Sequence, residues 1–144
     1  YALHRALGIT AILAVATHVI ALQLDSFVQF SWLQLLATPW TAGYRPFAVT
    51  LGFLAMISLL LTASSGALRR RLPGWRIVHL LSYVTFGLSV FHGFLAGSDS
   101  GSLTAILIYA SALVAVGVTV LRKLLPKPSQ RSPAMKSEET VRTA

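Results

Sequence analysis

The stretch PFAVTLGFLAMISLLLTASSGALRRR, residues 46–71, carries no charged side chain from Pro46 to Leu68 and then three arginines in succession. About 20 apolar residues in a helix cross the ~30 Å hydrocarbon layer of a bilayer. Three further uncharged runs show the same pattern: Ala6–Leu22, Ile77–Gly97 and Ser102–Leu121. Inside lipid, a helix satisfies its own backbone hydrogen bonds. The sequence therefore predicts an all-α membrane protein with four transmembrane helices in a bundle.

The composition agrees with this class. Of the 144 residues, 55% are hydrophobic and only 11% are charged, against roughly 25% charged in average soluble proteins. The mean hydropathy is +0.70, and a soluble domain of this length could not bury so much apolar surface. The lipid bilayer is therefore the first expected partner. The lack of cysteine excludes disulfides, iron–sulfur clusters and covalent haem attachment.

The net charge of +8 is unevenly placed. Basic residues gather between the second and third runs and after the fourth: Arg69, Arg70, Arg71, Arg76, Arg122, Lys123, Lys127, Arg131, Lys136 and Arg142. Clusters flanking apolar runs mark cytoplasmic ends of helices, so we expect no nucleic-acid partner and a cytoplasmic C-terminus. The first and third helices then run in the same direction across the membrane.

Two segments differ from the spans. Between the first two runs, aromatic and apolar residues recur at roughly helical spacing, which favours a short interfacial helix over an irregular loop; they are Phe27, Phe30, Trp32, Leu33, Leu36 and Trp40. Residues 126–144 contain three prolines, several serines and mixed charge, which is typical of disorder. We therefore predict a membrane domain over residues 1–125 and a disordered cytoplasmic tail over 126–144.

All four histidines fall in the first and third runs, as His4 and His18 and as His79 and His92. The first two are 14 residues apart, which is nearly four helical turns, and so they share one face about 21 Å apart along the axis. Because the two helices run parallel, His4 matches His79 in depth and His18 matches His92. Ionisable side chains inside a membrane are costly and suggest function.

Two imidazoles that face each other across a bundle can be the axial ligands of a six-coordinate haem iron. Small residues near them would leave room for the macrocycle or serve ordinary helix packing; they are Gly8, Ala11, Ala14, Gly87 and Gly93. The 13-residue spacing from His79 to His92 leaves them about 140° apart on an ideal helix. The third helix must therefore contact two haems on different flanks or be distorted, and Gly87 is a candidate for the bend.

Other interpretations are weaker. A zinc or di-iron site wants carboxylates beside the histidines, and the four runs have none. A proton relay would need several ionisable groups in line. A small transporter would be expected to have buried carboxylates and pairs of broken helices, and the four runs show neither. Histidines bonded to Thr17, to Ser82 or to backbone carbonyls, in a structural or accessory subunit with one haem or none, remain an alternative.

Several motifs resemble the ferric reductase-like transmembrane domain family. They are RRLPGWRIVHLLSY at residues 70–83, FHG at 91–93, AGSD at 96–99, LHR at 3–5 and LDSF at 24–27. The family includes ferric reductases, NADPH oxidase cores and the haem subunit of the bacterial periplasmic methionine sulfoxide reductase system. The resemblance covers about residues 1–121.

The resemblance implies two b-type haems with bis-histidine ligation, an inner one on His4 and His79 and an outer one on His18 and His92. It implies electron transfer from a cytoplasmic flavin or NAD(P)H donor to an extracytoplasmic acceptor. Basic side chains would pair with haem propionates, although membrane topology alone also explains them: Arg5, Arg70, Arg71 and Arg76 inside, and Arg45 with Tyr44 outside.

The chain has no glycine-rich phosphate loop after its last apolar run. It would thus be an oxidoreductase component without its own catalytic residues, served by a separate flavin reductase or another donor. The acceptor would be a periplasmic protein or a larger complex in a bacterial inner membrane. Members of the family often have about six helices, so we expect a missing upstream helix, in agreement with Tyr1 in place of Met.

Overall fold

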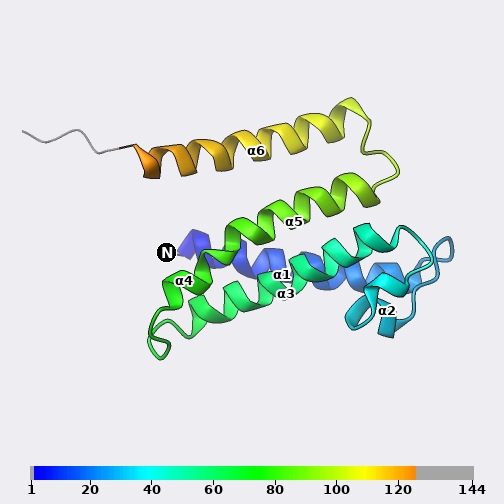
Figure 1. The fold of residues 1–144 in the computed structure, drawn as a ribbon, viewed down its shortest axis with the longest axis horizontal. Coiled ribbons are helices and arrows are strands. Elements are labelled where there is room, and N and C mark those ends of the chain that lie inside the picture. Colours follow the sequence, from blue (N-terminus) through cyan, green and yellow to red (C-terminus); the bar gives the residue numbers. More distant parts are fainter. Residues whose placement is uncertain (1, 126–144) are drawn as a thin grey trace, which may run out of the picture. The chain divides into compact units, whose positions relative to one another are not determined.

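The computed structural model describes residues 2–125, and in this range it is helical with no strand. The elements in chain order are α1 (Ala2–Leu24), α2 (Trp32–Leu36), η1 (Pro39–Thr41), α3 (Pro46–Ala67), α4 (Trp75–His79), α5 (Leu81–Ala96) and α6 (Leu103–Leu124) (Figure 1). The tail predicted over residues 126–144 lies outside the described residues.

Four helical segments are long and apolar enough to cross a membrane: Ala2–Leu24, Pro46–Ala67, Trp75–Ala96 and Leu103–Leu124. This confirms the predicted all-α class with four membrane-spanning helices. The chain divides into two compact units, of which the first ends at Ala105 and the second begins at Ile106. The second unit contains most of α6, whose last turn holds Arg122 and Lys123, where positive charge complements the helix dipole.

In the first unit, α3 and α5 form the closest helix pair. The buried residues of α3 are all small and recur every three to seven positions along one face: Ala48, Ala55, Ser58, Thr62 and Ser65. Such a stripe lets two backbones approach closely in a membrane. Midway along the pair, the Thr85 hydroxyl donates a hydrogen bond of 2.9 Å to the Ser58 hydroxyl. The α3–α5 pair is therefore the most closely packed part of this unit.

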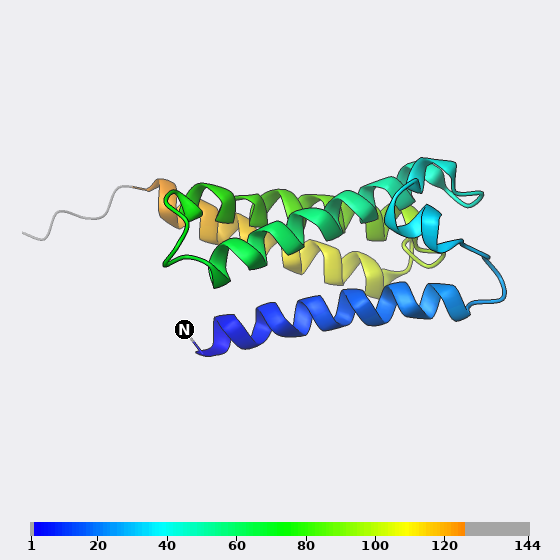
Figure 2. The same ribbon diagram turned by 90° about the horizontal axis from the view of Figure 1, so that it is seen from below.

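Helix α1 runs beside this pair in the same direction as α4 and α5 (Figures 1 and 2). It contacts α3 much less than α5 does, and none of its residues is buried. Large apolar side chains such as Leu3, Leu7 and Leu13 are exposed, as expected of a helix that faces lipid. Helix α1 is therefore packed more loosely in this unit than α3 and α5 are against each other.

The helix predicted between the first two spans is present and short. Its start is a capping box, in which the Ser31 hydroxyl accepts from the Gln34 N–H and the Gln34 side chain accepts from the Ser31 N–H. Trp32 and Trp40 are largely exposed, whereas Leu35 is buried. The segment thus has one apolar side turned outward and one turned to the core of the unit.

A corner at Tyr44 and Arg45 joins the start of α3 to the end of α5. Arg45 has a left-handed backbone conformation, with φ of 40°, which is uncommon for a residue other than glycine. Its guanidinium donates to the main-chain carbonyls of Leu95 and Gly97, and the Tyr44 hydroxyl donates to the Ala96 carbonyl at 3.2 Å. The last carbonyls of α5, which have no partner within the helix, are thereby capped.

Candidate functional site

The four histidines form two pairs that bridge α1 and the α4–α5 segment. The ring centroids of His4 and His79 are 5.9 Å apart with an interplanar angle of 72°. Those of His18 and His92 are 6.2 Å apart with an angle of 78°. The structure therefore brings together the partners that were matched by depth in the sequence. Their role as metal ligands remains a prediction.

Each histidine of the α4–α5 segment is anchored to the backbone of α3 by its Nδ1 atom. His92 Nδ1 lies 2.8 Å from the Ala48 carbonyl oxygen, and His79 Nδ1 lies 3.3 Å from the Thr62 carbonyl oxygen. A carbonyl only accepts, so in these bonds Nδ1 carries the proton and Nε2 keeps its lone pair. Metal-bound histidines usually donate their other N–H to such an acceptor.

Backbone carbonyls were among the ordinary partners considered for these histidines, and the bonds found go to α3 rather than to Ser82. They use only one nitrogen of each ring. The Ser65 hydroxyl, 3.5 Å from His79 Nδ1, is a second neighbour of the same nitrogen. The acceptors on α3 therefore leave Nε2 of both rings available for a ligand.

The separations of the rings fit two imidazoles on one metal ion. A metal–imidazole bond of about 2 Å and roughly 1.1 Å from nitrogen to ring centroid, counted on both sides, give about 6.2 Å between centroids. Rotation about each bond leaves the interplanar angle free. Within residues 2–125, no group of three or more His, Cys, Asp or Glu side chains gathers. The remaining ligands would thus come from a cofactor such as a porphyrin.

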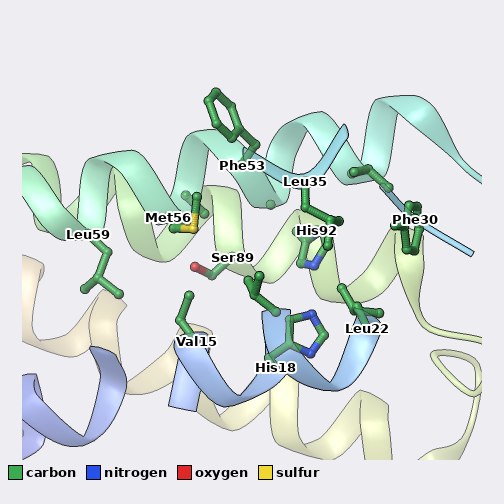
Figure 3. Close-up of a pocket in the computed structure, with 14 residues that line it drawn as sticks. Val15, His18, Leu22, Phe30, Leu35, Phe53, Met56, Leu59, Ser89 and His92 are labelled. Carbon is green, nitrogen blue, oxygen red and sulfur yellow. The ribbon is translucent and has the colours of Figure 1, made fainter. Parts of the chain in front are cut away.

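A cavity of about 220 Å³ lies between the His18 and His92 side chains (Figure 3). Its walls are mostly apolar, with Val15 and Leu22 from α1 and Met56 from α3. Phe30 and Leu35 line one end. The volume is below the ~300–1,000 Å³ of usual ligand pockets, so this cavity is smaller than a porphyrin needs.

The glycines that touch the histidines lie on α3, and sequence reasoning did not find them. A Cβ atom at Gly52 would stand 2.6 Å from His92 Cε1, and one at Gly66 would stand 3.5 Å from His79 Cε1. At Gly8 and Gly87, where small residues were expected to matter, a Cβ would meet nothing within 4 Å. The signal was available, because Gly52 and Gly66 are 66 − 52 = 14 residues apart, the spacing of His4 and His18.

The predicted distortion of the third span falls at Leu80 and not at Gly87, which lies inside the continuous helix α5. Three successive hydrogen bonds link residues three apart, from Ile77 to Gly74, from Leu80 to Ile77 and from Tyr83 to Leu80. A three-residue turn adds about 20° per residue to the helical rotation. This winding closes part of the 140° difference that the 13-residue spacing predicts.

Near the His4–His79 pair, the Trp75 ring is 5.7 Å from the His79 ring, and the Arg76 guanidinium lies 5.9 Å from the centroid of the Trp75 ring. Arg76 is thus held beside this pair through an aromatic side chain. Arg5 follows His4 directly in α1 and is exposed. These positions are compatible with the predicted propionate contacts, which stay predictions.

The contacts described for the other predicted arginines do not place them as near to the histidines as Arg76. Arg70 and Arg71 lie in the exposed connection between α3 and α4. Arg45 lies over the Tyr44 ring at 5.3 Å and holds two carbonyls at the end of α5. Its observed role is therefore that of a helix cap, which sequence reasoning did not foresee.

The fold and the site together define an all-α membrane protein with two cross-helix imidazole pairs in its first unit. Comparisons with protein families, with curated proteins and with solved structures find no match to this chain. The functional interpretation therefore rests on the geometry of the pairs and on the sequence motifs.

Proposed function

We propose that the chain is a di-haem b membrane cytochrome of the ferric reductase-like type, which transfers electrons across the bilayer. The observation that carries the proposal is the repeated geometry of the pairs. In each pair, the α4–α5 histidine is bound through Nδ1 to a carbonyl of α3. The centroid of its ring lies 5.9 or 6.2 Å from that of a histidine of α1. This is close to the separation of about 6.2 Å that two imidazoles on one metal ion would have.

In this proposal His4 and His79 hold one haem and His18 and His92 hold the other. A bound haem supplies an iron that takes up and releases one electron. The carbonyls of Ala48 and Thr62 orient the rings, and the apolar cavity walls exclude water. The two levels are about 21 Å apart, from fourteen residues at 1.5 Å each.

The charges support a direction for this transfer. The His4–His79 pair lies at the end of the unit that carries Arg5, Arg69–Arg71 and Arg76, which the positive-inside rule assigns to the cytoplasm. No charged residue lies between Asp25 and Arg45 at the other end. Electrons would come from a separate cytoplasmic flavin reductase or other donor. They would leave to a periplasmic acceptor or a larger complex, in a bacterial inner membrane.

A structural or accessory subunit with one haem or none is the second candidate. Ring centroids 4.5–7 Å apart at steep angles are also usual for plain aromatic pairs, and both histidine pairs fall in this range. The cavity of about 220 Å³ favours the same view, because it is smaller than a haem pocket needs. The two candidates differ in haem content.

The test is to purify the chain from haem-replete cells and to record its reduced-minus-oxidised spectrum with haem quantitation. We expect a low-spin b-type spectrum with two haems per chain. We expect His79→Ala to lose the haem of its own pair and to retain the other. Wild-type protein without haem would contradict the proposal. Unchanged spectra with altered assembly in His79→Ala would support the accessory role.

A further inference from the structure

The acceptor carbonyl and the contacting glycine stand in the same relation at both levels of α3. His92 bonds to the carbonyl of Ala48 and contacts Gly52, four residues later. His79 bonds to the carbonyl of Thr62 and contacts Gly66, again four residues later. The two arrangements are thus copies of one motif, displaced by 14 residues along one helix.

Helix geometry explains why the glycine belongs to the motif. In an α-helix, the carbonyl of one residue accepts the N–H of the residue four positions later, so the side chain of that later residue stands beside the carbonyl. A carbonyl oxygen has two lone pairs, and the second is reachable only if the flank is open. Glycine at the later position opens it to an imidazole from the α4–α5 segment.

We infer that α3 carries two positioning seats, Ala48/Gly52 and Thr62/Gly66, which fix the tautomer and the orientation of His92 and His79. Each seat holds Nδ1–H of its ring on a carbonyl and directs Nε2 towards the histidine of α1. The consequence for a metal rests on the proposed function, whereas the tautomer is a property of the chain itself.

The two seats differ in tightness. At Ala48/Gly52 the hydrogen bond is 2.8 Å, and an added Cβ would lie within 2.7 Å of both His92 Cε1 and Nδ1, a distance that real Cβ atoms essentially never show. The ring cannot swing away without breaking its bond. At Thr62/Gly66 the bond is 3.3 Å, and an added Cβ would be in ordinary contact at 3.5 Å. One seat therefore excludes every side chain, and the other tolerates a methyl group.

Gly52→Ala and Gly66→Ala form a matched pair for the test. Both exchange glycine for alanine inside the same helix, and so both favour the helix by about 1 kcal/mol. We expect Gly52→Ala to lose the haem of the His18–His92 pair or to raise its midpoint potential, because a weaker bond to Nδ1 makes the ligand less basic. We expect Gly66→Ala to have a smaller effect on the His4–His79 pair, and Gly117→Ala in α6, where an added Cβ would meet nothing within 4 Å, to keep wild-type haem content and potentials. An unchanged Gly52→Ala, or equal effects in both variants, would overturn the inference.

A second measurement does not depend on haem, and its readout is taken on the wild-type protein. Solid-state ¹⁵N NMR of histidine-labelled wild-type protein in lipid reports the tautomer of each ring, and His92→Gln assigns the His92 signals. We expect His92 to carry its proton on Nδ1 and none on Nε2. A ring protonated at Nε2 alone would overturn the seat. Protein without haem but with the expected tautomer would refute the proposed function and uphold the seat.

Discussion

The two histidine pairs of the first unit are built on the same motif and differ in how firmly they are held. Around His18 and His92, the third span is a continuous helix, its end is capped by Arg45, and Gly52 admits no side chain. Around His79, the span is wound into three-residue turns and interrupted at Leu80. The His18–His92 pair is thus constrained by the helix, by its cap and by Gly52, whereas the surroundings of His79 are less tightly packed. A repeated histidine motif thus does not produce two equivalent sites.

The largest expected effect comes from the α1 histidines, His4 and His18, which the proposed function makes haem ligands. We expect His18→Ala to abolish the haem of its pair, and His4→Ala to abolish the other, because each removes a ligand atom. Both residues are exposed on a helix with no buried residue. The free energy of unfolding of the haem-free protein should therefore change by less than about 0.5 kcal/mol. Haem quantitation and unfolding in detergent measure both quantities. A large loss of stability without loss of haem would assign these histidines to packing alone.

An intermediate effect is expected at the corner that distinguishes the His92 end. Arg45→Ala removes two hydrogen bonds from a charged donor to the carbonyls of Leu95 and Gly97, each worth about 1.5–3 kcal/mol. Relief of the left-handed backbone does not offset this loss, because alanine also has a Cβ. We expect a stability loss of at least about 2 kcal/mol, measured by denaturant unfolding in micelles.

Tyr44→Phe is the control for Arg45, since it removes one neutral hydrogen bond, to Ala96, and should cost about 1 kcal/mol. We expect the spectrum of the His18–His92 pair to change in Arg45→Ala and that of the His4–His79 pair to stay the same. An equal change at both pairs would show that the corner does not favour one site.

The smallest effect is expected at Ser65, beside the looser seat. Its hydroxyl donates to the Thr62 carbonyl at 2.7 Å and stands 3.5 Å from His79 Nδ1. Ser65→Ala should therefore cost no more than about 1 kcal/mol and move the His79 ¹⁵N signals slightly. Ser58→Ala, which loses the bond from Thr85, has a similar cost of roughly 0.6 kcal/mol and serves as the control. Movement of the His92 signals by Ser65→Ala would contradict the separation of the two seats.

Much of the fold follows from the sequence, because lipid allows few choices for an uncharged run. The arginines at 69–71 are consistent with antiparallel second and third spans, and the parallel direction of the first and third spans then matches His4 with His79. The expectation depends only on run length and on the positions of charges. The four long apolar helices confirm the number of spans, whereas the orientation of the chain in the membrane stays a prediction.

The details of the site depend on tertiary contacts that periodicity does not report. Which face of α3 meets α5 decides that Gly52 and Gly66, and not Gly8 and Gly87, lie beside the histidines. The tighter winding at Leu80 could not be predicted from the residue type, because position 80 is neither proline nor glycine. The cap made by Arg45 depends on a left-handed backbone at a residue type that rarely adopts it.

The sparse contact of α1 with the rest of the first unit has a consequence for biogenesis. Both seats are complete within α3 and the α4–α5 segment, before α1 contributes a single atom. Because α1 precedes α3 and the α4–α5 segment in the sequence, its histidines can meet their partners only after those segments have been made. Under the proposed function, the seats on α3 would be open to a flat cofactor from the lipid until α1 packs against them.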